Sequence, residues 1–352
     1  MNISVKEFLS LLNKVQPGLS KKETLEQSTH FVFKGGRVYT FNDEVAVSVK
    51  SNFELDFEGA IPSKELLSFL NKTKEETLRI REKSGELLFI GKRTQMGLFM
   101  ESTISLPVDE VKIPKTFSPI PKNFLDAVSF CLFSAGSDSA TPALMCVHVA
   151  ETFVETCDGF RMTRKALCSP MPIKMGLIPA SSARFFSEYK IDKCAANKGW
   201  VHFKEDSGLV FSCRVEELEF PNMEPFLKVK GDKVVIPESV VDNLERCAIF
   251  SKSDHEYQRT VEITFQEGKM IIYGDGEFGW IKEKVDVDYT GPSLNFIVSP
   301  KHLKDILTTK QTVTVGDGHL KFHGEDFDHV ICLFVPSEEE SDAQDETAQE
   351  DD

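Results

Sequence analysis

The stretch Ile61-Pro62-Ser63-Lys64-Glu65-Leu66-Leu67 is the clearest of six similar segments that divide the chain into near-equal lengths. Each segment starts with an apolar residue typical of a strand end, has Pro or Ser where a helix would begin, and continues with apolar residues at helical spacing. The segments begin at Ile3, Ile61, Ile120, Ile178, Ile236 and Ile297, so their offsets are 58, 59, 58, 58 and 61 residues. This regularity predicts helices at 3–16, 62–74, 121–134, 181–193, 237–252 and 299–310.

Between these segments the sequence is rich in strand formers. Residues 261–265 and 270–273 are separated by Gln266-Glu267-Gly268-Lys269, which predicts a hairpin. A second marker, a strand ending at Asn or Asp, recurs at Asn42, Asp158 and Asp275, with offsets of 116 and 117 residues. The two markers together predict an α+β fold of three tandem units, each made of two helix-plus-sheet halves. We expect domains at 1–112, 113–227 and 228–336, followed by a tail at 337–352.

The net charge of −15 at first argues against a nucleic-acid partner, because phosphates repel acidic surfaces. Its distribution changes that interpretation. Residues 337–352 hold nine acids and no Lys or Arg, a composition typical of a disordered, solubilising tail. The six predicted helices together carry +5, and the rest of the body carries −11. Equivalent helices that share one surface would attract phosphates, although the acidic segment 237–252 works against this.

Several classes of protein are excluded by composition and motif. No apolar run approaches the roughly 20 residues of a membrane helix, and the N-terminus does not resemble a signal peptide. The eight cysteines are scattered and contain no CxxC pair, which is typical of buried thiols in a reducing cytoplasm. No phosphate-binding loop, nucleophile elbow or HExxH motif occurs. His319, His323 and His329 are close in sequence, but the first two would share one strand face, so we expect no metal, no cofactor and no enzyme activity.

A three-fold repeat of two-halved α+β units with basic helices resembles the bacterial β sliding clamps, the DNA polymerase III beta subunits that act as processivity factors. Residues Thr156-Cys157-Asp158-Gly159-Phe160-Arg161-Met162 resemble the Thr-Asp-Gly-His-Arg-Leu segment of that family. Residues Glu219-Phe220-Pro221-Asn222-Met223 resemble its Phe-Pro-Asp-Tyr segment. The resemblance covers residues 1–336, and three units rather than two point to the bacterial type, from a bacterium or a phage.

The resemblance implies a head-to-tail homodimer that closes into a ring, with twelve helices lining the hole and sheets outside. Such a ring encircles double-stranded DNA topologically and slides, because weak phosphate contacts are nearly equal at every register. It tethers the replicative polymerase, and the polymerase and a separate ATP-driven clamp loader bind it through short peptide motifs. The alternative is a clamp-like protein that competes for clamp-binding partners without encircling DNA. A third possibility is an uncharacterised enzyme on a repeated scaffold, which a buried titratable cluster in a cleft would support.

Three groups of site residues follow from the resemblance. The first is a peptide pocket, an apolar groove with an arginine at its rim, formed by Cys157, Gly159, Phe160, Arg161, Met162, Pro221, Phe226, Val330, Cys332, Leu333 and Phe334. The second is a set of DNA-binding cations: Lys21, Lys22, Lys64, Lys72, Arg184, Lys190, Lys252, Lys301 and Lys304. The third is a dimer interface at Met96, Leu98, Ile249 and Phe250. Phe160 departs from the family's usual His, and the chain continues past Phe334 where the family ends, so partner specificity is expected to differ.

Overall fold

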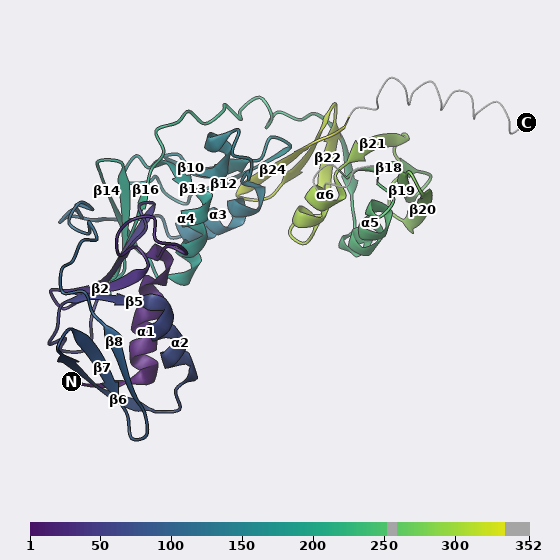
Figure 1. The fold of residues 1–352 in the computed structure, drawn as a ribbon. Helices are drawn as coiled ribbons and strands as arrows, with labels where there is room; N and C mark the ends of the chain where they lie inside the picture. The colour runs from purple at the N-terminus through teal and green to yellow at the C-terminus, as the bar shows by residue number, and fades with distance from the viewer. Residues whose placement is uncertain (252–258, 335–352) are drawn as a thin grey trace, which may run out of the picture. The chain divides into compact units, whose positions relative to one another are not determined.

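The computed structural model describes residues 1–251 and 259–334 (Figure 1). The chain divides into two compact units. Unit 1 comprises Met1–Leu132, Cys146–Thr152 and Leu167–Glu219, and unit 2 comprises Phe133–Met145, Phe153–Ala166 and the chain from Phe220 onward. The three predicted domain boundaries are a different division and stay a prediction. The predicted tail at 337–352 lies outside the described residues.

Unit 1 contains two antiparallel sheets. The first follows the order β1-β6-β7-β8, at Asn2–Ser4, Thr77–Lys83, Glu86–Ile90 and Gln95–Phe99. The second follows the order β5-β2-β3-β4-β16-β15-β14-β9, at Gly59–Pro62, His30–Lys34, Arg37–Phe41, Val45–Lys50, Val210–Arg214, Trp200–Lys204, Lys193–Asn197 and Ser118–Pro119. A further pair joins β10 (Cys146–Val149) to β13 (Gly176–Pro179).

Unit 2 has the same design. Its strands β11-β12-β24-β23-β22-β17 follow one another at Phe153–Cys157, Arg161–Ala166, Phe327–Cys332, His319–His323, Thr312–Gly316 and Gly231–Val235. A four-stranded sheet has the order β20-β19-β18-β21, at Gly279–Asp286, Lys269–Gly276, Val261–Gln266 and Leu294–Val298.

The helices form three pairs. Helix α1 (Val5–Val15) packs beside α2 (Ser63–Lys72), as Figure 1 shows, and α5 (Val241–Ala248) packs beside α6 (Pro300–Leu307). Helix α3 (Phe124–Cys131) packs beside the 3₁₀ turn η4 (Arg184–Glu188), which continues α4 (Ala180–Ala183). The predicted α+β class of repeated helix-plus-sheet halves is therefore confirmed.

Aromatic side chains fill the cores under these helices. In α1, Phe8 is fully buried and stacks on Phe33 of β2, with ring centroids 6.3 Å apart. Under α3 and η4, the ring of Phe186 lies 4.6 Å from that of Phe203, which stacks on Phe124 at 5.8 Å. Large buried rings of this kind supply much of the hydrophobic stabilisation, which explains the abundance of Phe in the sequence.

The fourth predicted helix is too long, because only its first part is helical, as α4 continued by the 3₁₀ turn η4. Residues 181–193 were expected to be helical from their apolar spacing, but α4 and η4 end at Glu188 and β14 begins at Lys193. Tyr189 adopts an extended conformation, and its hydroxyl donates a hydrogen bond of 2.8 Å to the carbonyl oxygen of Lys14 in α1. This tertiary contact overrides local propensity, so Lys190 lies in a loop rather than on a helix.

The repeated Asn/Asp marker is a turn at Asn42 and Asp158, whereas Asp275 does not end its strand but lies inside β19, opposite Trp280 of β20. The Oδ1 atom of Asn42 accepts hydrogen bonds from the N–H groups of Glu44 and Val45, at 3.1 and 2.7 Å. The Oδ1 atom of Asp158 accepts from Phe160 and Arg161 in the same way, at 3.0 and 2.9 Å. Such bonds fix a tight turn between two strands.

The predicted hairpin at 261–273 is confirmed. Gln266 of β18 pairs with Lys269 of β19, which leaves Glu267 and Gly268 as a two-residue turn. Both turn residues have positive φ, at 51° and 72°, as the common type I′ hairpin requires.

Candidate functional site

All the residues predicted for the peptide pocket lie in unit 2, on the β11–β12 hairpin, in the segment after Phe220, and on or just after β24. Buried Cys157, Met162, Met223 and Val330 form an apolar floor. Antiparallel pairing explains the floor, because Cys157 lies opposite Met162 and Met162 lies opposite Val330, so the three side chains share one face.

Further apolar side chains surround this floor. Leu144, Phe220, Leu227 and Val229 pack against it while remaining partly exposed. Leu144 and Met223 are not among the predicted pocket residues, although Met223 ends the segment Glu219-Phe220-Pro221-Asn222-Met223.

Phe160 stands out from the protein surface at the tip of the β11–β12 hairpin. Gly159 before it has a φ of 91°, a conformation that residues with a Cβ rarely adopt, so the turn depends on glycine. The Phe160 ring is 42 % exposed and stacks on the ring of Phe334, with centroids 6.4 Å apart and planes 15° apart. The Phe160 carbonyl also accepts a 2.8 Å hydrogen bond from the N–H of Cys332. The hairpin tip and the chain after β24 therefore present one aromatic surface.

A second aromatic pair lies in the same unit. The exposed ring of Phe226 packs at 5.7 Å from the imidazole of His319 on β23. The N–H of Leu333, which follows β24, donates a hydrogen bond to the carbonyl of Gly318 before β23. We call the exposed rings of Phe160 and Phe226 and the half-buried ring of Phe334, together with the apolar floor, the aromatic patch. Aromatic rings and an apolar floor in the same unit suit a short peptide with Leu or Phe anchors.

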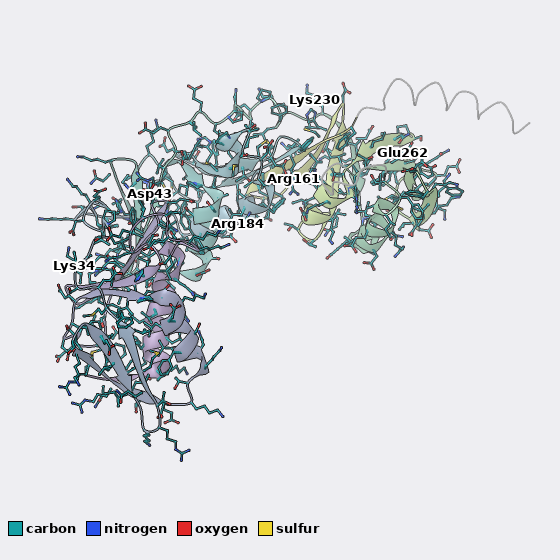
Figure 2. The ribbon with its side chains drawn as sticks, in the orientation of Figure 1. Lys34, Asp43, Arg161, Arg184, Lys230 and Glu262 are labelled. Atoms are coloured by element: carbon teal, nitrogen blue, oxygen red, sulfur yellow. The ribbon has the colours of Figure 1, made fainter. Side chains whose placement is uncertain are left out.

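Arg161 is not at the rim of a groove, as the sequence suggested, but buried, with 4 % of its surface exposed. Its Nε atom donates to the Asp158 carboxylate at 2.9 Å, and one terminal nitrogen donates to the Asp305 carboxylate of α6 at 2.6 Å. The other terminal nitrogen donates to the carbonyl of Phe133 at 2.6 Å. Figure 2 labels Arg161 within unit 2. The side chain joins the hairpin to α6, so its donors are already engaged.

Buried histidines lie around this network and on the second sheet of unit 1. His302 of α6 packs under Phe160, with its Nε2 atom 4.0 Å from the Asp158 carboxylate. His329 of β24 shares a 2.8 Å hydrogen bond with the Thr163 hydroxyl, and His202 of β15 shares one with the Ser212 hydroxyl. Burial lowers the pKa of His202 and of His302 to about 4, and the Arg161 guanidinium adds to the effect at His302.

These lowered pKa values predict acid sensitivity. The unfolded chain takes up protons at both imidazoles below pH ~6.5, whereas the folded chain keeps them neutral down to the lowered pKa. The two neutral histidines therefore cost the fold nothing above pH ~6.5. Below that pH, we expect the free energy of unfolding to fall by about 1.4 kcal/mol per pH unit for each of the two histidines as the pH drops toward 4.5. Urea unfolding at several pH values measures this slope. His202→Gln should make it shallower, and an unchanged slope would contradict the assignment.

The predicted DNA-binding cations divide between the two units. In unit 1, Lys21 and Lys22 lie in the loop after α1, Lys64 and Lys72 lie on α2, and all four are exposed. Arg184 at the start of η4, labelled in Figure 2, and Lys190 are exposed as well. Helix α1 adds exposed Lys6 and Lys14, which line a hollow of about 360 Å³ and were not among the predicted residues.

The cations of unit 2 are less accessible. Lys301 of α6 is half-buried, and Lys304 forms an ion pair with Glu245 of α5. Lys252 lies outside the described residues. The acidic α5 therefore neutralises part of the charge of α6, as the sequence charges suggested.

Exposed apolar side chains gather at the free strands β8 and β20, which end the two four-stranded sheets. At the end of β8, Phe99 is 79 % exposed, whereas the predicted interface residue Leu98 is buried opposite Leu87. Around the start of β20, Phe278 is 93 % and Trp280 is 64 % exposed.

The other predicted interface residues vary in exposure. Ile249 after α5 is exposed, and Phe250 and Met96 are half-buried. Successive side chains of a strand point to opposite faces, so Leu98 points inward and Phe99 points outward. This alternation distinguishes residues of the core from residues that can contact a second copy.

Within residues 1–251 and 259–334, no group of three His, Cys, Asp or Glu side chains is placed to hold a metal ion. No helix in these ranges is long and apolar enough to cross a membrane.

Comparison with solved structures gives the fold an independent assignment. A DNA polymerase sliding clamp from Pseudomonas aeruginosa matches with a TM-score of 0.81 and 18 % identity, over 96 % of this chain and 99 % of that chain. The DNA polymerase III beta subunit from Thermotoga maritima gives 0.80 and 16 %, and the sliding clamp from Bacillus subtilis gives 0.79 and 15 %, both over 96 % and 99 %. No protein-family model and no curated protein matches the chain. Over nearly its whole length, the chain has the fold of the bacterial DNA polymerase III beta sliding clamps.

Proposed function

We propose that this protein is a DNA sliding clamp that encircles duplex DNA and tethers a replicative DNA polymerase for processive synthesis. The observation that carries the proposal is the match to clamp structures over almost all of both chains. No catalytic step is assigned to the protein, because its task is topological. The proposed site of action is the cytoplasm of a bacterium, where the DNA lies.

The pairing of strands inside the chain supports ring closure by a second copy. Six runs of consecutive strands end in β4, β8, β12, β16, β20 and β24. The end strand of the first run pairs with that of the fourth, as β4 with β16, and the third pairs with the sixth, as β12 with β24. In both pairs the two runs are three apart. The same rule pairs the second run, which ends in β8, with the fifth run, which ends in β20, and this pair would form between two copies of the chain. Two copies joined in this way close head to tail.

The side chains at the free strands fit this pairing. Both internal junctions are antiparallel, so the end of β8 would meet the start of β20. Phe99 would then lie near Trp280 and Phe278, which removes their exposed rings from water. Pairing also satisfies the N–H and C=O groups of two free strand edges. A solution mass of twice 39.6 kDa is the expected result, measured by light scattering.

For DNA contact, the proposal uses the exposed cations of the helices and their loops. Lys21, Lys22, Lys64, Lys72, Arg184 and Lys190 are free to make phosphate contacts, and Lys6 and Lys14 of α1 join them. Such contacts carry no sequence information, so the ring holds DNA without stopping on it.

The aromatic patch is the proposed site for short peptides from the polymerase and the clamp loader. Phe160→Ala and Phe334→Ala are each expected to weaken binding of a polymerase-derived peptide about 30-fold, which is a loss of about 2 kcal/mol at an interface anchor. Phe160 is exposed and Phe334 is only half-buried, so these variants should fold normally. Fluorescence anisotropy of a labelled peptide gives the affinities. Ile113→Ala, which removes an exposed apolar side chain of unit 1 outside both proposed contact sites, is the control, and equal affinities in all variants would place the peptide elsewhere.

The second candidate is a clamp-like competitor that binds clamp partners without encircling DNA. The ion pair between Lys304 and Glu245 favours it, because this pair reduces the positive charge on the α5–α6 pair. The competitor would bind peptides as the clamp does and would show no topological hold on DNA.

A further inference from the structure

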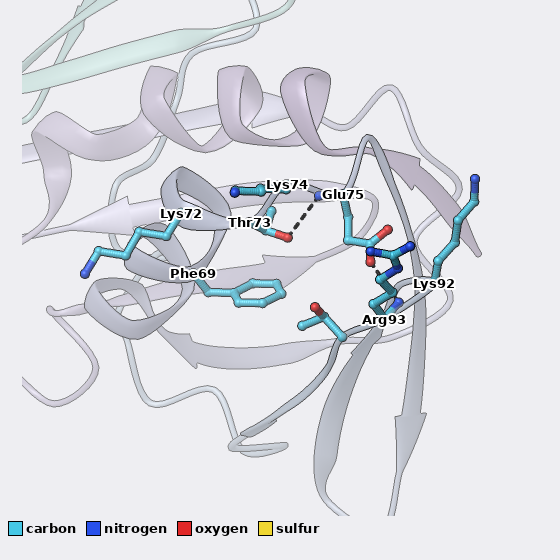
Figure 3. A pocket seen from close by; sticks show the side chains of 8 residues that line it. Phe69, Lys72, Thr73, Lys74, Glu75, Lys92 and Arg93 are labelled. Carbon is cyan, nitrogen blue, oxygen red and sulfur yellow. Dashed lines mark hydrogen bonds between the residues drawn. The ribbon is translucent and has the colours of Figure 1, made fainter.

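A basic hollow of about 670 Å³ lies in unit 1, between the end of α2 and the turn that joins β7 to β8 (Figure 3). Lys72 and Lys74 line it from the helix end, and Lys92 and Arg93 line it from the turn. Phe69 forms an apolar wall and packs against buried Phe89, with centroids 6.3 Å apart. Four cations around one hollow attract an acidic ligand.

The carboxylate of Glu75 links the helix end of the hollow to the β7–β8 turn. Glu75 Oε1 accepts a 2.9 Å hydrogen bond from the N–H of Arg93, and the N–H of Glu75 donates to the Thr73 hydroxyl at 3.3 Å. The backbone N–H groups of Arg93 and, second, of Lys92 hold the pKa of Glu75 below its usual value. A Cβ on Gly91 would lie 2.6 Å from the Glu75 carboxyl carbon, so glycine allows this close approach.

Glu75 is therefore used to close the turn, and Lys74, Lys92 and Arg93 remain available for an acidic ligand, beside Lys72, which is also a proposed DNA contact. Within residues 1–251 and 259–334, no ion pair engages Lys72, Lys74, Lys92 or Arg93. Four cations around the single carboxylate of Glu75 still repel one another, and a further anionic partner relieves the repulsion.

We propose that this hollow binds the acidic tail of the neighbouring copy in the ring, residues 337–352. The inference rests on the proposed clamp dimer. The tail carries nine acids and no Lys or Arg, so its charge complements that of the hollow. Glu338, Glu339 and Glu340 begin a run of acids that can contact several cations at once.

The sheet order shows that the tail is long enough. Phe334, the last described residue, donates its N–H to the carbonyl of Ile297 on β21, at 2.9 Å. The first strand spacing runs from Phe334 to β21, and four more cross β18, β19 and β20 to the partner's β8. Five spacings of about 4.8 Å each make about 24 Å. Residues 335–352 can extend over about 60 Å, which leaves ample length to reach the partner's β7–β8 turn.

Tail binding would give the ring a second link across each junction. The β8–β20 contact is apolar at one end, whereas the link between tail and hollow is electrostatic. Salt screens exposed charges of this kind, so the second link weakens at high ionic strength while the apolar contact persists. Deletion of residues 337–352 is expected to raise the Kd of the dimer about tenfold in low salt and to leave it unchanged at 1 M salt.

The test is zero-length cross-linking of carboxylates to lysines in a mixture of isotope-labelled and unlabelled full-length chains. We expect mixed-isotope cross-links between the tail and Lys72, Lys74 or Lys92. Lys92→Glu combined with Arg93→Glu should abolish them and weaken binding of a peptide of residues 337–352 to the tail-deleted chain at least tenfold. Lys112→Glu with Lys115→Glu, an exposed pair away from the hollow, is the matched control.

The outcomes separate this inference from the proposed function. A dimer by light scattering whose tail forms no cross-links, or cross-links only within one chain or to Lys64, overturns the tail assignment and leaves the clamp proposal standing. A monomer by light scattering overturns the clamp proposal itself. Loss of DNA retention in the Lys92 and Arg93 variant, with tail cross-links unchanged, would assign the hollow to DNA instead.

Discussion

Replacing Trp280 by Asp is expected to convert the dimer into monomers, and Phe99→Asp on the other side of the junction should do the same. Each change places a carboxylate where the proposed pairing buries an exposed ring. Losing a large aromatic anchor costs about 2 kcal/mol or more, and burying an unpaired charge adds to this. We therefore expect the dimer Kd to rise at least 100-fold for either variant, as measured by light scattering over a dilution series.

The chain offers a clean control for this experiment. Leu218 is an exposed apolar residue outside both free strands, so Leu218→Asp should leave the dimer Kd unchanged. All three substitutions are at the surface and should leave the melting temperature of the chain nearly unaltered. A Trp280→Asp chain that dimerises like the parent would show that β20 is not a ring contact.

Arg161→Ala is expected to lower the free energy of unfolding by about 3–5 kcal/mol, the usual cost of removing one partner of a buried ion pair. The change leaves Asp158 and Asp305 without their cation and the Phe133 carbonyl without a donor. Because domains are stable by only about 5–15 kcal/mol, this variant should unfold at markedly lower urea concentrations.

Arg214→Ala is the matched comparison for that measurement. Arg214 forms a 2.6 Å ion pair with Asp43, but both side chains are exposed to solvent. An exposed pair of this kind contributes about 0–1 kcal/mol. Equal losses for the two variants would contradict a structural role for Arg161 and return it to the peptide site.

The repeat could be predicted from the sequence because the same physical constraint recurs six times. Each strand-to-helix junction needs an apolar strand end and a residue suited to a first helical turn, and these leave a visible pattern. The Asn42 and Asp158 turns recur because side-chain oxygens there satisfy backbone N–H groups. Local patterns of this kind can be predicted from a single sequence without a structure.

The burial of Arg161 could not be predicted in this way. Its partner Asp305 lies 144 residues further along the chain, so no local pattern reveals the ion pair. The same holds for the pair between Lys304 and Glu245, 59 residues apart, which reduces the charge of a predicted DNA-binding residue. Long-range contacts also shortened the predicted helix at 181–193, where Tyr189 bonds to Lys14.

The four residues predicted for the ring interface differ in exposure, because Leu98 is buried whereas Ile249 is exposed. Leu98 points inward, and the exposed rings are Phe99, Phe278 and Trp280. A shift of one residue in a strand exchanges interior and exterior, and sequence resemblance at low identity does not fix that register.

The most direct test of the account is retention on circular DNA. The protein is loaded by a clamp loader with ATP onto a nicked circular plasmid, separated from free protein, and then measured before and after the plasmid is cut once. A clamp that encircles DNA stays on the circle and is lost from the cut DNA, because a sliding ring leaves through a free end. Retention that does not change on cutting, or no retention on the circle by a protein that still binds polymerase peptides, would contradict the proposed function.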